Sequence, residues 1–190
     1  MLLKQQKIQL EGAALECTVK VLHMTQLRNA LESLSRRWLT QGLPSRDGLF
    51  EAAEELNRWK RQNGVAGIWP VTPLLLTATL DDGIGQGIEI IKLFSEVIGL
   101  EVKPLGLLQP PEQIVTACLK EEPAFLGLTV LQIDSEDDLA FIGKRIAPPT
   151  RIIAGGPAFK YDAGMAKRCR VHHVAPNVAD YINFLLNLNI

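Results

Sequence analysis

From about residue 73 onward, apolar runs of strand length alternate with segments whose apolar residues recur at helical spacing. This alternation is typical of βαβ units, in which a helix connects two parallel strands. The expected strands are residues 74–80, 101–107, 125–131, 151–154 and 171–174. The pattern therefore predicts an α/β fold with a five-stranded parallel sheet flanked by helices, in the Rossmann-like (flavodoxin-like) manner.

Several residues mark the ends of the connecting helices. Gly99 is suited to end the helix that follows the first strand, because glycine readily adopts the left-handed backbone conformation found after helices. Pro110 and Pro111 suit the entry to the next helix, since proline is tolerated in a first turn. Asn177 is the expected N-cap of the last helix.

Residues 1–72 show a different pattern and are expected to form a small module appended to the α/β domain of residues 73–190. Polar and apolar residues alternate over 7–11 and 15–21, which predicts a β-hairpin, with a helix from Ala13 as the alternative. Two helical stripes follow, over 27–38 and 49–59, with an N-cap expected between them at Ser45 or Asp47. The expected module is a hairpin plus two helices.

The charge balance argues against a nucleic-acid or membrane partner. The 190 residues carry 20 basic and 21 acidic side chains, so the net charge is -1 and no electropositive field is expected. The opening MLLKQQK lacks the apolar stretch of a secretory signal. We expect a cytoplasmic protein.

Cysteines and histidines are sparse. Cys17, Cys118 and Cys169 are widely spaced, which predicts reduced, partly buried thiols instead of disulfides or a metal knuckle. His172 and His173 are adjacent in the last expected strand, so their side chains should point to opposite faces. Packing roles are favoured for this pair over metal binding.

The segment LLLTATLDDGIGQG, residues 74–87, joins the first strand to its helix through a glycine-rich turn. Ligands of open α/β sheets bind outside the carboxyl ends of the strands, where helix N-termini present free N–H groups. Asp81 and Asp82 bring negative charge to this turn, which disfavours a phosphate ligand. Adjacent acidic residues in a loop usually form a solvated turn or cap.

Two nucleotide or phosphate interpretations of this turn are weak. A dinucleotide fingerprint requires a glycine where Ile88 stands. A phosphate-receiver site would use Asp81 and Asp82 to hold Mg²⁺. That site would also need a phosphoacceptor aspartate at the end of the third strand, where Thr129 stands.

Three loops at the expected carboxyl edge are rich in small or unobstructive residues. They are residues 83–87, 129–131 and 155–158, and together they would form the floor of one broad cleft for a large flat or elongated ligand. The alternative is that the glycines serve the turns alone.

The order of these motifs resembles the cobalamin (B12)-binding domain of corrinoid proteins and methionine synthase, over residues 72–190. The motifs are Asp-Asp-Gly-Ile-Gly, then Leu-Gly-Leu-Thr-Val-Leu, then Ile-Ile-Ala-Gly-Gly-Pro-Ala, then Val-Ala-Pro-Asn. In that family an Asp-x-His-x-x-Gly motif, a Ser-x-Leu motif and a Gly-Gly pair surround the dimethylbenzimidazole tail of the cofactor. The resemblance implies the following cofactor-binding residues: Asp82, Gly83, Ile84, Gly85, Gln86, Thr129, Leu131, Gly155, Gly156, Pro157, Ala175 and Pro176.

The sequence departs from the family at the position of the residue that ligates cobalt. The alignment puts Asp82 where the family has its cobalt-ligating histidine, and Leu80 where it has that histidine's acidic partner. A carboxylate is a poor substitute for neutral imidazole on cobalt. The resemblance therefore implies cobalamin without a histidine ligand, or a pocket that has lost the cofactor.

No arrangement in the sequence indicates a self-contained enzyme, such as a Ser-His-Asp set or a G-x-S-x-G elbow. The first hypothesis is a cobalamin-binding or corrinoid-carrying protein that serves a methyltransferase or a sensing partner, in which the cofactor supplies the chemistry. The second is a cofactor-free descendant that acts as an interaction or regulatory module. The N-terminal module would cap the cofactor, mediate pairing of two copies, or dock a partner.

Overall fold

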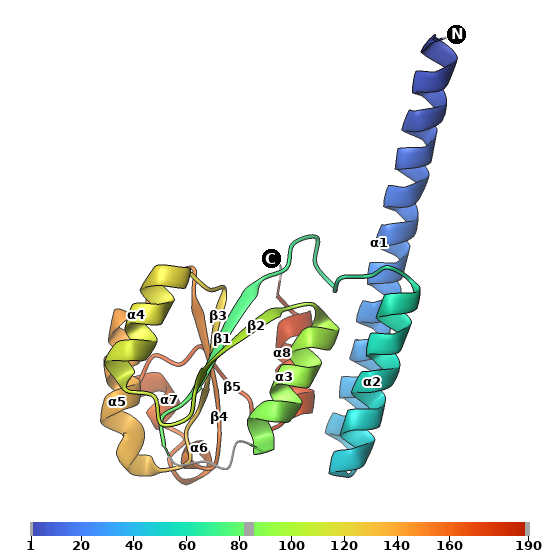
Figure 1. The fold of residues 1–190 in the computed structure, drawn as a ribbon. Coiled ribbons are helices and arrows are strands. Elements are labelled where there is room, and N and C mark those ends of the chain that lie inside the picture. The colour runs from blue at the N-terminus through green and yellow to red at the C-terminus, as the bar shows by residue number, and fades with distance from the viewer. Residues whose placement is uncertain (1, 82–85, 189–190) are drawn as a thin grey trace.

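The computed structural model describes the backbone of residues 2–81 and 86–188, and the side chains of 17–81 and 87–188. A parallel sheet carries helices on both faces, and a long N-terminal helix extends beyond the α/β part (Figure 1). The elements in chain order are α1 (Leu2–Gln41), α2 (Arg46–Gln62), β1 (Leu74–Thr79), α3 (Gln86–Ile98), β2 (Glu101–Gly106), α4 (Pro111–Glu121), β3 (Phe125–Thr129), the 3-10 turn η1 (Ile133–Ser135), α5 (Glu136–Arg145), β4 (Arg151–Gly155), α6 (Ala158–Tyr161), α7 (Met165–Arg168), β5 (His173–Val174) and α8 (Val178–Leu186).

The sheet confirms the α/β prediction. Its five strands are all parallel and lie in the order β2-β1-β3-β4-β5. The chain moves to one side of β1 to form β2 and to the other side to form β3, so the crevice for ligands is expected between the carboxyl ends of β1 and β3. The register places Thr79 opposite Thr129, and Thr129 opposite Gly155. These three residues lie side by side at the carboxyl edge.

The three central strands, β1, β3 and β4, bury side chains on both faces, which explains why they are almost continuously apolar. The edge strands β2 and β5 are less buried. Leu75, Phe125 and Ile153 belong to the core under α3 and α8. Leu76, Leu126 and Ile152 belong to the opposite core, under α4 and α5. The period of two along each strand thus divides its apolar residues between two helical layers.

The helical pair α1–α2 packs outside α3 and α8 and shares their core. Leu27 and Leu31 of α1 are fully buried. The rings of Trp38 in α1 and Phe94 in α3 meet edge to face, with centroids 5.5 Å apart, a favourable geometry for aromatic rings. Because the core is continuous from the pair to one face of the sheet, the division into residues 1–72 and 73–190 stays a prediction.

The β-hairpin predicted over residues 7–21 is wrong, because α1 is helical from Leu2 to Gln41. Polar and apolar residues alternate there over only a few positions. The same residues are mostly good helix formers, such as Leu, Lys, Gln, Glu and Ala. A helix that is already fixed by packing at Leu27 and Leu31 extends at low cost, since propagation is easier than nucleation. Within the described residues, no helix is both long enough and apolar enough to cross a lipid bilayer.

The connection from α2 to β1 is held against the end of α3. Ile68 N–H donates to the carbonyl of Ile98 at 2.9 Å. A Cβ on Gly67 would lie 2.5 Å from the Cα of Gly99, so the two backbones touch. Gly99 has a φ of +103° and ends α3 as predicted.

Most predicted helix ends agree with the structure. The side chains of Ser45 and Asn177 accept hydrogen bonds from backbone N–H groups in the first turns of α2 and α8, which confirms both caps. The third strand ends at Thr129 rather than 131. The physical reason is that Asp81 binds the N–H of Leu131 at 2.8 Å, which turns the chain away from the sheet.

Candidate cofactor site

A cavity of about 700 Å³ lies over the carboxyl edge of the sheet. Its volume falls within the roughly 300–1,000 Å³ typical of small-molecule and cofactor sites. We call it the wide cavity. Its lining residues are Leu43, Leu49, Thr79, Gly87, Ile88, Ile90, Ile91, Thr129, Leu131, Gly155, Gly156, Pro157, Ala175, Pro176, Asn177 and Val178.

Three parts of the fold build the wide cavity. Its floor is the carboxyl edge of the sheet, where Thr79, Thr129 and Gly155 are neighbours in register. Its wall is formed by α3 and by the start of α8. Leu43, between α1 and α2, and Leu49 of α2 also line it, so the helical pair contributes directly to the site.

The structure brings seven of the predicted site residues together around this cavity. They are Thr129, Leu131, Gly155, Gly156, Pro157, Ala175 and Pro176. Asp82, Gly83, Ile84 and Gly85 lie outside the described residues, and for Gln86 the backbone alone is described, as the first residue of α3. The assignment of these residues to cofactor binding stays a prediction.

Sequence analysis did not assign several other lining residues to the site. Ile88 and Ile91 are apolar residues of α3. Both line the wide cavity. Leu43 lies between the end of α1 and the start of α2, just after Gly42. An apolar residue in this break between two helices is the sequence signal that could have marked it as a lining residue. Leu43 is 42% exposed.

Asp81 is not part of a solvated turn, contrary to the sequence-based expectation. Its side chain is buried, and its Oδ2 accepts hydrogen bonds from Leu131 N at 2.8 Å, Gln132 N at 2.9 Å and Ser135 Oγ at 3.0 Å. The carboxylate therefore fastens the loop after β3 to the end of β1. Among the described residues, no group of three potential metal ligands is assembled.

Gly155 and Gly156 allow segments of backbone to approach each other at the carboxyl edge. A Cβ on Gly156 would lie 2.1 Å from the carbonyl oxygen of Val130, and Gly156 has a φ of +122°. A Cβ on Gly155 would lie 2.9 Å from the carbonyl oxygen of Ala175. Packing of the protein itself thus requires both glycines, which supports the alternative that they serve the turn.

Beneath the wide cavity, between the sheet and helices α3 and α8, lies a cavity of about 60 Å³ that we call the deep compartment. The two cavities share Ile88, Ile91, Thr129, Gly155 and Ala175. The remaining residues of its lining are Leu75, Thr77, Gly127, Leu128, Ile153, Ala154 and Tyr181.

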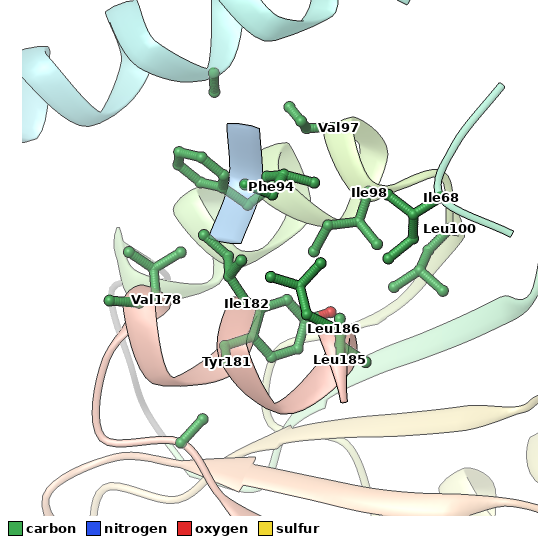
Figure 2. Packing of buried hydrophobic residues seen from close by; sticks show 14 of the residues in the cluster. Ile68, Phe94, Val97, Ile98, Leu100, Val178, Tyr181, Ile182, Leu185 and Leu186 are labelled. Atoms are coloured by element: carbon green, nitrogen blue, oxygen red, sulfur yellow. The ribbon is translucent and has the colours of Figure 1, made fainter. Parts of the chain in front are cut away.

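Tyr181 closes one side of the deep compartment with a ring that is almost fully buried. It lies in the packed layer where side chains of α8 and α3 point toward one another (Figure 2). Its hydroxyl lies 2.7 Å from Ser95 Oγ, which itself donates to the carbonyl of Ile91 at 2.6 Å. Burial raises the pKa of the Tyr181 phenol above its usual range, so the group stays neutral.

The histidines and cysteines that the sequence analysis considered do not line the wide cavity where their side chains are described. His172 Nδ1 accepts a hydrogen bond from Ile152 N at 3.0 Å, and His173 Nε2 lies 2.6 Å from Asp180 Oδ1. Burial raises the pKa of the Cys118 thiol to about 11, which disfavours the reactive thiolate. Cys17 is exposed, so the expectation of partial burial is wrong for this cysteine. No histidine or cysteine occurs among the described residues that line the wide cavity.

No protein-family model matches this sequence, and no curated protein matches it. Solved structures do match its fold. A novel cobalamin-binding protein from Desulfitobacterium hafniense DCB-2 has a TM-score of 0.71 at 18% sequence identity, over 95% of this chain and 90% of that one.

Two structures from Methanosarcina barkeri are also similar. The monomethylamine corrinoid protein has a TM-score of 0.52 at 16% identity, over 85% of this chain and 95% of that one. A chain of the methanol:cobalamin methyltransferase complex MtaBC has a TM-score of 0.55 at 18% identity, over 86% of this chain and 66% of that one. The structural neighbours are thus cobalamin-binding and corrinoid proteins, and the chain has the fold predicted from its resemblance to the cobalamin-binding domain.

Proposed function

We propose that this chain binds cobalamin in the wide cavity and carries it for a methyltransferase or sensing partner. The observation that supports this proposal is the position of the cavity, at the carboxyl edge of a sheet whose fold is shared with cobalamin-binding proteins. Small residues leave the edge uncrowded, and Leu43 and Leu49 of the helical pair line it as well. A large flat ligand suits this shape.

Cobalamin would supply the cobalt atom that takes up and releases a methyl group. The chain would bind, orient and shield the cofactor. The carboxyl edge would hold it from below, and Ile88, Ile90 and Ile91 would exclude water on the side of α3. We further propose that no histidine of this chain ligates cobalt, because Asp82 stands at the aligned position.

The N-terminal helical pair is proposed to cap the cofactor. Leu43 and Leu49 reach the wide cavity, and α1 and α2 are held to α8 and α3 by a common core. A cap of this kind would limit access of solvent to the bound cofactor. Pairing of two copies and docking of a partner stay predictions for the remainder of this module.

The direct test is retention of cobalamin. Purified protein is incubated with hydroxocobalamin or methylcobalamin, desalted, and its absorbance is measured. We expect a coloured complex with one cofactor per chain. A colourless protein would overturn the proposal and favour the cofactor-free interaction module.

Gly87 offers a matched pair of variants that locate the site. It lies in the first turn of α3 and lines the wide cavity, and a Cβ there meets no described heavy atom within 4 Å. Gly87→Trp should place an indole ring in the cavity with no clash at its Cβ and weaken cobalamin binding at least tenfold, about 1.4 kcal/mol. Gly87→Ala should bind as the wild type does. Equal binding by both variants would show that the cofactor lies elsewhere.

A further inference from the structure

The first half of α1 extends beyond the rest of the molecule (Figure 1). Contacts with the other elements begin at His23, whose ring meets the Trp59 ring edge to face, and at Leu27, which is fully buried. Residues 17–22 are all exposed. We call residues 2–22 the projecting segment and the rest of the described chain the body. At 1.5 Å per residue, the projecting segment is about 32 Å long.

One line of positions along the projecting segment is apolar. It consists of Ile8, Gly12, Leu15, Val19 and Leu22, which alternate in spacing between four and three residues and therefore follow one face of a helix. We call these positions the apolar line. Val19 and Leu22 are 42% and 54% exposed. Most of the stability of a helix in a protein comes from packing of such a face, so the apolar line is suited to be covered.

The apolar line ends where the body begins. The next positions at the same spacing are Gln26, Asn29, Ser33, Arg36 and Thr40, and all of them are polar and exposed. The same face of α1 is thus polar where the body supports the helix and apolar only where the helix extends past the body. An occupant of this face would cover the projecting segment alone.

The order of residues along the apolar line suits a second copy of the same chain. A two-fold axis at Leu15 brings Ile8 opposite Leu22 of the partner subunit. The same axis brings Gly12 within one residue of Val19 of the partner subunit, so a small residue faces a branched one. A two-fold contact requires this self-complementarity, whereas an unrelated partner imposes no symmetry on the line.

This axis makes the two helices antiparallel and keeps the wide cavity open. Leu43, which lines the cavity, follows Gln41 at the other end of α1. Antiparallel pairing would place the two bodies at opposite ends of the paired helices, with both cavities unobstructed. Parallel pairing would bring the two bodies to the same end and continue the contact into the polar positions Gln26 and Asn29.

The charge of the projecting segment disfavours a membrane surface as the occupant. The segment carries the three lysines Lys4, Lys7 and Lys20 and the two glutamates Glu11 and Glu16, a net charge of +1. Helices that lie on anionic membranes have a polar face rich in lysine and arginine. The glutamates interrupt such a face here.

We propose that two copies of this chain pair through the apolar lines of their projecting segments, antiparallel and with the bodies at opposite ends. The inference does not depend on the proposed function. Because a single helix of each copy makes the contact, we expect the dimer to dissociate on dilution.

The test is sedimentation velocity of the full chain at concentrations from low to high micromolar. We expect a monomer at the lowest concentration and a dimer at the highest. Val19→Glu combined with Leu22→Glu puts charges on the apolar line and should stay monomeric throughout. Asn29→Glu combined with Ser33→Glu is the matched control, since both residues are exposed on the same face of α1 beside the body, and it should dimerise as the wild type does.

Three results would overturn the inference. The first is a wild-type chain that stays monomeric at every concentration. The second is a dimer that persists in the Val19 and Leu22 double variant with unchanged helix content by circular dichroism. The third is wild-type chain that sediments with vesicles of phosphatidylcholine and phosphatidylglycerol while the double variant does not, which would assign the apolar line to a membrane.

Cobalamin retention separates this inference from the proposed function. The wide cavity lies at the opposite end of α1 from the projecting segment, so both double variants should retain as much cobalamin as the wild type. A dimer that retains no cobalamin would overturn the proposed function and leave the pairing standing.

Discussion

Replacing Asp81 with alanine tests whether its carboxylate holds the loop after β3 in place. Oδ2 accepts three hydrogen bonds, from Leu131 N, Gln132 N and Ser135 Oγ. A hydrogen bond to a charged group contributes about 1.5–3 kcal/mol, and donors left without a partner in a buried site cost more than donors that water can reach.

The magnitude follows from where the three donors lie. Gln132 is exposed, so water can replace the carboxylate at its N–H, whereas Ser135 is buried and Leu131 is half-buried. Two bonds are therefore lost without full replacement, and we expect Asp81→Ala to lower the free energy of unfolding by about 3 kcal/mol. For a chain of this size, that corresponds to a fall in Tm of about 6–12 °C.

Urea unfolding followed by circular dichroism measures this loss by linear extrapolation. Asp134→Asn is the matched control, since Asp134 is an exposed carboxylate in the same loop, and it should change stability by less than about 0.5 kcal/mol. A loss of under about 1 kcal/mol in Asp81→Ala would refute the idea that this carboxylate fastens the loop.

Two further changes probe the packing around α3. Burial lowers the pKa of Lys60 to about 8, so between pH 8 and about 10.5 the unfolded chain binds more protons at this residue and stability should rise with pH. Urea unfolding across this range measures the pH dependence of stability, and Lys60→Met should reduce its slope by the equivalent of about one proton. Gly67→Ala should destabilise by about 1–3 kcal/mol because its Cβ would lie 2.5 Å from the Ile98 carbonyl, and a thermal melt equal to that of the wild type would contradict this contact.

The central strands could be predicted because their apolar residues follow from the burial of both faces. Pairs such as Leu75–Leu76 and Ile152–Ile153 are apolar at both positions because each face of the sheet is covered by helices. The caps at Ser45 and Asn177 depend on side-chain chemistry within three residues. Both features depend on residues that are close together in the sequence, so they can be recognised without knowledge of the fold.

The long helix α1 and the role of Asp81 could not be predicted, because each depends on contacts distant in sequence. Helix α1 is fixed by burial of Leu27 and Leu31 against the α/β part, and residues before them continue the helix. Asp81 binds residues 50 to 54 positions later. A short stretch of alternating residues, or an acidic pair after a strand, carries no information about such partners.

A glycine that lines a cavity can leave space for a ligand or allow close backbone packing, and its surroundings in the fold decide which. Gly155 and Gly156 both line the wide cavity. However, a Cβ on Gly155 would meet the backbone carbonyl oxygen of Ala175, and a Cβ on Gly156 would meet that of Val130. Loss of cobalamin binding in a Gly156 variant would follow from a distorted edge as readily as from a blocked site. Gly87 lines the same cavity with open space around it. A substitution there changes the volume available to a ligand and adds no clash at Cβ, so the effect of Gly87→Trp tests whether a ligand occupies this cavity.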